Sequence, residues 1–326
     1  MIRPTIRFNA LVLEVVLVGL CIALALTAPR FLTADNLLNI LRNVSMQGMS
    51  ALGMTMVIIA GEIDLSVGSA VAFAGCWTAV LVQNLAGPSL GLPMEVAVVL
   101  AVAVALMTGF GVGCFSGFMR TQYQVPSFIT TLALMTGLTG AAELITNGFP
   151  LTPFPDWYNV IGGGYLAGIP VPALAFLVAF LVVQTVMNHT TFGRAVYAVG
   201  GNAEAARLSG INVRAVKILV LGITGGLAAL SGVLQSSEIM SGTATTARGW
   251  ELDIIAAVII GGTSLMGGVG RVWGTMIGVI FLGVIINGMT LLNISEYWQH
   301  VARGLLILFA VLLNRLQGSL GGKRAG

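Results

Sequence analysis

Charged residues are scarce in this chain of 326 residues: Asp, Glu, Lys and Arg together make up 8%, against about 25% in a typical soluble globular protein. A soluble protein of this length could not cover its surface with so few charges. Hydrophobic residues supply 57% of the chain, and its mean hydropathy is +0.97. Composition therefore excludes a cytosolic enzyme, a disordered chain and a nucleic-acid-binding protein. It predicts an all-α, polytopic protein of the lipid bilayer.

Residues that carry metal or nucleophilic chemistry are scarce as well. The three cysteines lie in apolar stretches without metal-ligand or redox spacing, and the two histidines have no Asp or Ser partner at a recognisable catalytic spacing. Neither of the two lysines, Lys217 and Lys323, follows a G-x-x-x-x-G-K-[ST] phosphate loop. We therefore expect no catalytic residue, no metal site, no resident cofactor and no ATPase activity in this chain.

Ten apolar stretches approach the length of about 20 residues that a membrane-spanning helix needs. They lie at 11–28, 44–61, 65–83, 95–117, 126–146, 170–188, 217–235, 251–267, 272–292 and 298–314. Eight or nine spans with a re-entrant segment fit this pattern nearly as well.

Basic residues distinguish between these counts, because they concentrate in cytoplasmic loops. With Arg3 and Arg7 in the cytoplasm, an odd number of spans would place the basic tail (Arg315, Lys323 and Arg324) on the outer side. We therefore predict ten spans, both termini cytoplasmic, in one transmembrane domain covering residues 1–326. Most acidic residues, including Glu251 and Asp253, are then expected toward the outer face.

Glycines recur four residues apart in three predicted spans, a spacing that lets helix backbones approach closely. The three sets are Gly109, Gly113 and Gly117, then Gly222 and Gly226, and finally Gly274 and Gly278. The pattern predicts a compact bundle and specifies no substrate.

The longest basic interruption, 188–217, is predicted to be a cytoplasmic loop that contains one short helix at 202–210. Asn202 is a good N-cap, and Gly210 can adopt the left-handed conformation that ends a helix. Glu204 near the start and Arg207 near the end match the helix dipole. Its small alanines would let a partner's groove close on the backbone, although a connector lying on the membrane surface fits the same pattern.

Residues 200–211, GGNAEAARLSGI, resemble the EAA-type loop of bacterial ABC importer permeases of the ribose/galactose-type carbohydrate family. Segment 61–69 (GEIDLSVGS) is similar to the family's (G/E)IDLSVGS signature. Segment 251–268 (ELDIIAAVIIGGTSLMGG) is similar to its ELDAIAAVVIGGTSLxGG signature, and 192–199 (FGRAVYAV) to the approach to the loop. The resemblance covers nearly the whole chain in order. Glu62 stands where many sugar permeases of the family have glycine, which leaves the substrate branch open.

The resemblance implies a bacterial inner-membrane subunit that imports a monosaccharide or similar small carbohydrate from periplasm to cytoplasm. The implied partners are a periplasmic sugar-binding protein, a second permease copy or homologue, and a cytoplasmic ABC ATPase that binds the ATP. The ATPase is expected to dock on the loop, with Ala205 deepest in its groove. The expected coupling residues are Asn202, Ala203, Glu204, Ala205, Ala206, Arg207 and Gly210.

A glycine-flanked turn between two apolar segments is the first candidate part of a translocation path. It holds Glu62, Asp64, Ser66 and Gly68. Carboxylates at membrane depth are functional candidates, and irregular backbone there is tolerated only when it is buried or lines a cavity. We favour the alternative that Asp64 caps the next helix with help from Ser66, and that Glu62 faces the cytoplasm.

A second candidate part of the path lies in the other half of the chain. Glu251 and Asp253 begin a predicted span, and a glycine-rich break that includes Gly261, Gly262, Thr263 and Ser264 follows it. Corresponding breaks in two halves are typical of internal repeats around a central path. Similarity between the halves is too weak to establish such repeats.

Three other functions compete with a sugar importer. An ion-driven secondary transporter could use Asp64 or Glu143 as its ion site, but it has no reason to keep an EAA-type loop. An ABC permease for a non-sugar such as autoinducer-2 would carry the same motifs. An intramembrane enzyme is least supported, because no catalytic constellation is present.

Overall fold

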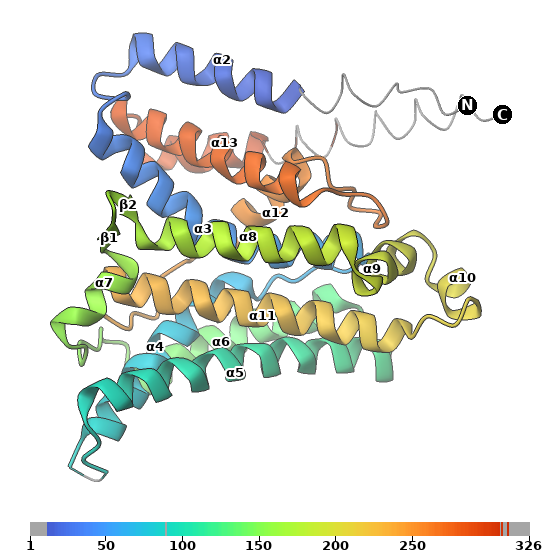
Figure 1. The fold of residues 1–326 in the computed structure, drawn as a ribbon, viewed down its shortest axis with the longest axis horizontal. Coiled ribbons are helices and arrows are strands. Elements are labelled where there is room, and N and C mark those ends of the chain that lie inside the picture. The colour runs from blue at the N-terminus through green and yellow to red at the C-terminus, as the bar shows by residue number, and fades with distance from the viewer. Residues whose placement is uncertain (1–11, 89, 307, 309–311, 313–326) are drawn as a thin grey trace.

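The computed structural model describes residues 12–88, 90–306, 308 and 312. Helices run side by side along the long axis of the molecule (Figure 1), which confirms the all-α, polytopic fold class. Within this described part of the chain, six helices are long and apolar enough to cross a membrane: α4 (Val67–Ala86), α5 (Met94–Gln122), α6 (Ser127–Thr146), α8 (Val171–His189), α11 (Val213–Glu238) and α13 (Val272–Leu291).

Four further helical segments lie within the other predicted apolar stretches and are shorter or more polar. They are α2 (Val12–Thr27), α3 (Ala34–Ile59), α12 (Trp250–Ile260) and an unlabelled helical stretch at 296–306. Each predicted apolar stretch thus contains helix, although these boundaries do not establish a count of ten spans. Arg3, Arg7, Arg315, Lys323 and Arg324 lie outside the described residues.

Small elements mark the two ends of the bundle (Figure 1). One end carries η1 (Asp156–Tyr158), α7 (Asn159–Gly162) and an antiparallel hairpin of β1 (Tyr165–Leu166) and β2 (Ile169–Pro170). We call it the hairpin end. The other carries α9 (Thr191–Gly201) and α10 (Ala203–Leu208), which lie within the predicted 188–217 loop. We call it the loop end.

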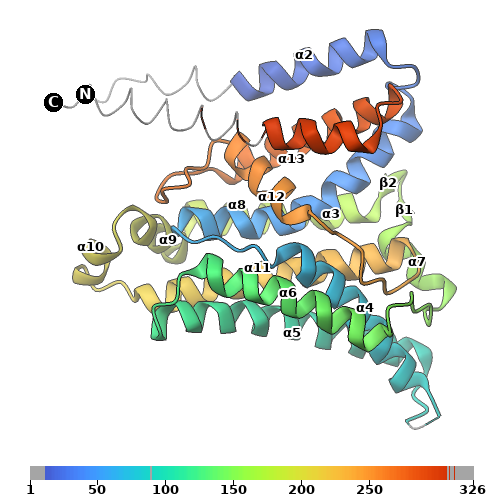
Figure 2. The same ribbon diagram turned by 180° about the vertical axis from the view of Figure 1, so that it is seen from behind.

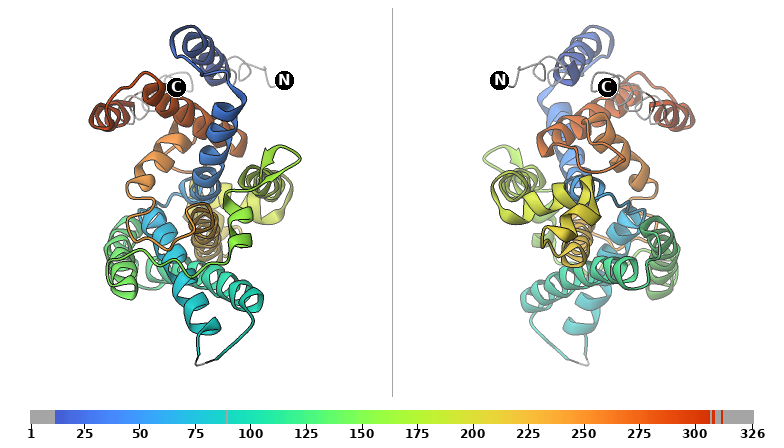
Figure 3. Two further views of the ribbon diagram at one scale, coloured as in Figure 1. Left: turned by 90° about the vertical axis from the view of Figure 1, so that its left-hand side faces the viewer. Right: turned by 90° about the vertical axis from the view of Figure 1, so that its right-hand side faces the viewer.

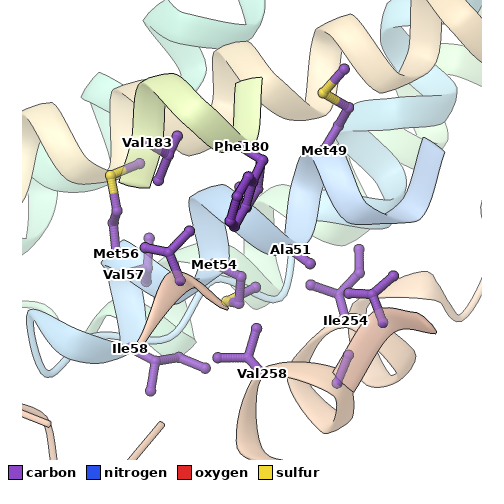
Figure 4. Close-up of a cluster of buried hydrophobic side chains, with 14 of the residues drawn as sticks. Met49, Ala51, Met54, Met56, Val57, Ile58, Phe180, Val183, Ile254 and Val258 are labelled. Carbon is purple, nitrogen blue, oxygen red and sulfur yellow. The ribbon is translucent and has the colours of Figure 1, made fainter. Parts of the chain in front are cut away.

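The hydrophobic core is built around the second half of α3, where nearly every side chain is buried. Figure 4 shows that this part of α3 packs between α8 and α12. The residues labelled there are Met49, Ala51, Met54, Met56, Val57 and Ile58 of α3, Phe180 and Val183 of α8, and Ile254 and Val258 of α12. A helix that is apolar on all sides has no face to offer to water, so it belongs inside the bundle.

Glycines bring α5 and α11 into close contact, in agreement with the compact bundle that the glycine spacing predicts. A β-carbon at Gly113 would overlap the carbonyl oxygen of Leu221, and one at Gly225 would overlap that of Gly109. In the end-on views, α11 (yellow to gold) lies near the centre of the bundle (Figure 3). Small residues therefore fix the distance between α5 and the central helix.

Candidate functional site

Helix α10 has the capped form that its sequence predicts. The Asn202 side chain accepts a hydrogen bond from the backbone N–H of Ala205 at 2.9 Å. Gly210 follows the helix with φ +84°, a left-handed conformation that glycine adopts without steric cost. These two residues confine the helix to Ala203–Leu208 at the loop end of the bundle.

The outer surface of α10 is formed by four residues: Glu204, Ala205, Arg207 and Leu208. Nε of Arg207 donates to the Glu204 carboxylate at 3.0 Å, and this hydrogen bond lowers the pKa of Glu204. Ala206, in contrast, is buried against the rest of the chain. Leu208 is 75% exposed, and sequence reasoning missed it because an apolar residue in a short helix is by default assigned inward.

The end of α9 packs on two glycine-rich segments that are distant in sequence. A β-carbon at Gly200 would overlap the carbonyl oxygen of Ile59, and one at Gly267 would lie 2.7 Å from the carbonyl oxygen of Gly200. The backbone N–H of Gly268 donates to that Ile59 carbonyl at 2.8 Å. Only glycine permits backbones to approach so closely. We call this meeting point the glycine junction, formed by Gly61, Gly200, Gly201, Gly267 and Gly268.

Tyr197 adds a side-chain link between α9 and the loop that joins α12 to α13. Its hydroxyl donates to the carbonyl oxygen of Gly270 at 3.1 Å. Burial raises the pKa of this phenol, so it remains a neutral hydrogen-bond donor at physiological pH. The loop containing α10 is therefore tied to the α12–α13 loop by both backbone and side-chain contacts.

Glu62 is buried in an ionic cluster, which corrects the expectation that it faces the cytoplasm. Its side chain is 4% exposed. It accepts two hydrogen bonds from Nε of Arg120, at 2.9 and 3.0 Å, and a third from Lys217. Arg120 lies in the last turn of α5 and Lys217 near the start of α11, so one carboxylate joins three segments at the loop end. Sequence spacing could not reveal partners 58 and 155 residues away.

The segment between α3 and α4 runs from the loop end into the interior, where α4 begins (Figure 2). The backbone N–H of Ile63 donates to Ser127 Oγ and that of Leu65 to Thr131 Oγ1, at 3.2 and 3.0 Å. Side chains of α6 thus satisfy irregular backbone at membrane depth, as a bilayer requires. The buried Asp64 carboxylate accepts from the N–H and the hydroxyl of Ser66, at 2.8 and 2.6 Å, directly before α4.

Helix α12 also begins in the interior, after an irregular segment that enters from the hairpin end (Figure 2). It has 11 residues, so at 1.5 Å per residue it is roughly 16 Å long, about half the hydrocarbon thickness. The predicted span at 251–267 is therefore a half-helix that ends at Ile260. Its glycine-rich continuation, with Gly261, Gly262, Thr263 and Ser264, forms the tight turn into α13 at the loop end.

The starts of α4 and α12 meet inside the protein. A β-carbon at Gly68 would overlap a carboxylate oxygen of Glu251. Asp253 is 7% exposed and binds Nη1 of Arg303 at 3.2 Å. Glu251 and Asp253 therefore lie about one α12 length from the loop end, at mid-depth, and not at the outer face as their sequence position suggested. The structure brings together residues of both candidate path segments.

The chain is similar to known transport proteins over nearly its whole length. The family model described as branched-chain amino acid transport system / permease component matches residues 36–311. The ribose import permease protein of Haemophilus influenzae is 40% identical over 309 residues, which is 94% of this chain and 93% of that protein.

Two further relatives cover most of both chains. The ribose import permease protein of Bacillus subtilis is 41% identical over 91% of this chain and 89% of its own. The L-arabinose transport system permease protein of Escherichia coli is 36% identical over 92% of this chain and 89% of its own. No solved structure matches the chain.

Proposed function

This chain belongs to the family of branched-chain amino acid transport system permease components, and from that premise we infer that it is the membrane subunit of an ABC importer for a small carbohydrate. The observation that carries the proposal is the identity of about 40% to ribose import permeases over more than nine-tenths of the chain. Other relatives are named as L-arabinose permeases. Both substrates are carbohydrates, so the relatives agree on the substrate class but not on the particular sugar.

The loop end is the cytoplasmic end in this proposal. It carries α10, Arg120, Lys217 and Arg271, in agreement with the concentration of basic residues on the cytoplasmic side. We propose ten membrane segments with both termini cytoplasmic in the bacterial inner membrane, α12 being a half-length segment. The protein would act as a dimer with a second copy or a homologue.

Helix α10 would be the docking site for a cytoplasmic ATPase and would move when that ATPase changes conformation. ATP would bind to the ATPase and not to this chain. Ala205 and Leu208 would enter the partner's groove, while Glu204 and Arg207 would contact its rim. Movement of α10 would pass through α9 to the glycine junction, where α9 contacts the end of α3 and the α12–α13 loop. The first of these segments leads to α4 and the second is joined to α12. One displacement would therefore move both helices whose starts meet at mid-depth.

ATP-dependent uptake in proteoliposomes tests the proposal. The permease would be reconstituted with its ATPase and binding protein, with labelled D-ribose and L-arabinose outside and ATP inside. We expect uptake of at least one sugar that requires both ATP and the binding protein and survives a protonophore. Uptake abolished by the protonophore while ATP is maintained would instead indicate the ion-driven transporter.

A further inference from the structure

Three amide side chains form a stripe along one face of α3. Asn39, Asn43 and Gln47 are four residues apart, so they stand above one another on the helix surface. Asn39 and Asn43 are exposed and Gln47 is half-buried, although the helix continues into the most buried part of the core. Gln47 lies near the middle of Ala34–Ile59. The stripe therefore descends from the hairpin end to about mid-depth.

None of these three amides has a hydrogen-bond partner among the described residues. One turn earlier, Asn36 shows the contrasting arrangement, because it exchanges hydrogen bonds with Asn287 of α13 at 3.1 and 2.8 Å. An amide without a partner in hydrocarbon costs several kcal/mol. This face of α3 therefore meets water or a polar ligand, and not lipid.

The stripe ends at a polar group on the half-helix. Gln47 and Asp253 border the same narrow gap, which is otherwise lined by apolar residues of α12 and α13 and is closed to water in this structure. Asp253 is paired with Arg303, whose Nε is buried without a hydrogen-bond partner among the described residues. The carboxylate and the guanidinium cancel in charge but retain donors and acceptors for a further ligand. Beside them, the start of α4 packs against Glu251.

We propose that Asn43, Gln47 and the Asp253–Arg303 pair contact the carbohydrate at mid-depth as it crosses the membrane. The inference rests on the proposed function and names the substrate-contacting residues within it. Planar amides, a carboxylate and a guanidinium supply donors and acceptors that match neighbouring hydroxyl groups. Because the ion pair is internally neutral, the site suits an uncharged polyhydroxyl compound. Mid-depth sites beside discontinuous helices are a recurring feature of transporters.

Cysteine accessibility tests this placement independently of transport. The background is a variant with Cys21, Cys76 and Cys114 replaced by alanine. Asn43→Cys and Gln47→Cys are introduced separately, and each protein is reconstituted with its ATPase and binding protein. Each complex is then treated with a water-soluble thiol reagent. The control is Leu181→Cys on α8, which is 54% exposed on an apolar helix face. We expect modification at positions 43 and 47 and little at 181, because thiolate formation requires water.

Substitution without a reagent tests the contact itself. Asn43→Leu and Gln47→Leu preserve approximate size and remove the hydrogen-bonding groups. We expect each to reduce D-ribose or L-arabinose uptake by about fivefold to tenfold, the effect of losing one polar contact, and to change the ratio between the two sugars. Leu181→Cys is expected to keep normal uptake.

The outcomes separate this proposal from the proposed function. Normal uptake by both leucine variants, with reagent modification no faster than at position 181, would overturn the assignment of the stripe while leaving the importer intact. Absence of ATP-dependent uptake of any sugar in the parent protein would contradict the importer itself. Retained assembly with the ATPase, measured by co-purification, excludes misfolding as the cause of a lost uptake.

Discussion

At the scale of single residues, the loop end of the bundle depends on one buried carboxylate and on glycines that admit neighbouring backbones. Glu62 neutralises two cations from different helices, Arg120 and Lys217. Gly200 occupies a point where any side chain would meet the end of α3. Both residues lie close to the cytoplasmic loop in the proposed orientation, so each affects stability and coupling together.

Glu62→Gln is expected to destabilise the fold, because it leaves Lys217 buried without a counter-charge. We expect a loss of about 1–3 kcal/mol in the free energy of unfolding, less than for a fully buried pair since Arg120 is partly exposed. Thermal unfolding in detergent would measure it. The control is Glu204→Gln, which breaks the solvent-exposed pair with Arg207. Equal shifts in the two variants would contradict a structural role for the cluster.

Gly200→Ala and Gly201→Ala form a matched pair at adjacent positions of α9. A β-carbon at Gly200 overlaps the Ile59 carbonyl oxygen, whereas one at Gly201 meets nothing within 4 Å. We expect Gly200→Ala to cost about 1–3 kcal/mol through forced backbone displacement and to reduce sugar uptake. Gly201→Ala should leave both unchanged. Similar uptake by the two variants would show that close packing at the glycine junction is unnecessary for transport.

At the scale of elements, α10 is a short helix with one face left exposed by the described part of the chain. Its caps and its i,i+3 ion pair stabilise it locally. Its buried Ala206 and the adjacent α9 position it against the bundle. This arrangement leaves Ala205 and Leu208 available to a partner.

Ala205→Trp is expected to block coupling without affecting membrane insertion. Because Ala205 is exposed, we expect the fold to accommodate an indole there, but the indole would prevent a groove from closing on the helix backbone. ATP-driven uptake should be lost, and co-purification of the ATPase should be weakened. The control is Val178→Trp, at a position 61% exposed on α8. Normal uptake by Ala205→Trp would eliminate α10 as the coupling element.

At the scale of the whole molecule, α10 and the hairpin lie at opposite ends of the bundle, and the proposed orientation places them on opposite sides of the membrane. Leu208→Cys and Tyr165→Cys test it, since both positions are well exposed at opposite ends. In a variant without the native cysteines, an impermeant thiol reagent should modify position 165 in right-side-out vesicles and position 208 only in inside-out vesicles. The reverse pattern would invert the proposed topology.

The sequence by itself determined the membrane class, the helical fold and the capped helix at 202–210. Scarcity of charge, apolar run length and cap residues are local properties, and they act in the same way wherever a segment comes to lie. Glycine spacing likewise predicted close helix packing, because the spacing itself defines a helix face, but it did not identify α5 and α11 as partners.

Only the tertiary structure decided where the charged and irregular segments lie. Glu62 forms ion pairs with Arg120 and Lys217, which are remote in sequence. The span predicted at 251–267 became the half-helix α12, so Glu251 and Asp253 moved from the outer face to mid-depth. Asn43 and Gln47 stand out only in the folded chain, where neither amide has a hydrogen-bond partner among the described residues. Depth and pairing depend on contacts between distant segments, which hydropathy along one segment does not encode.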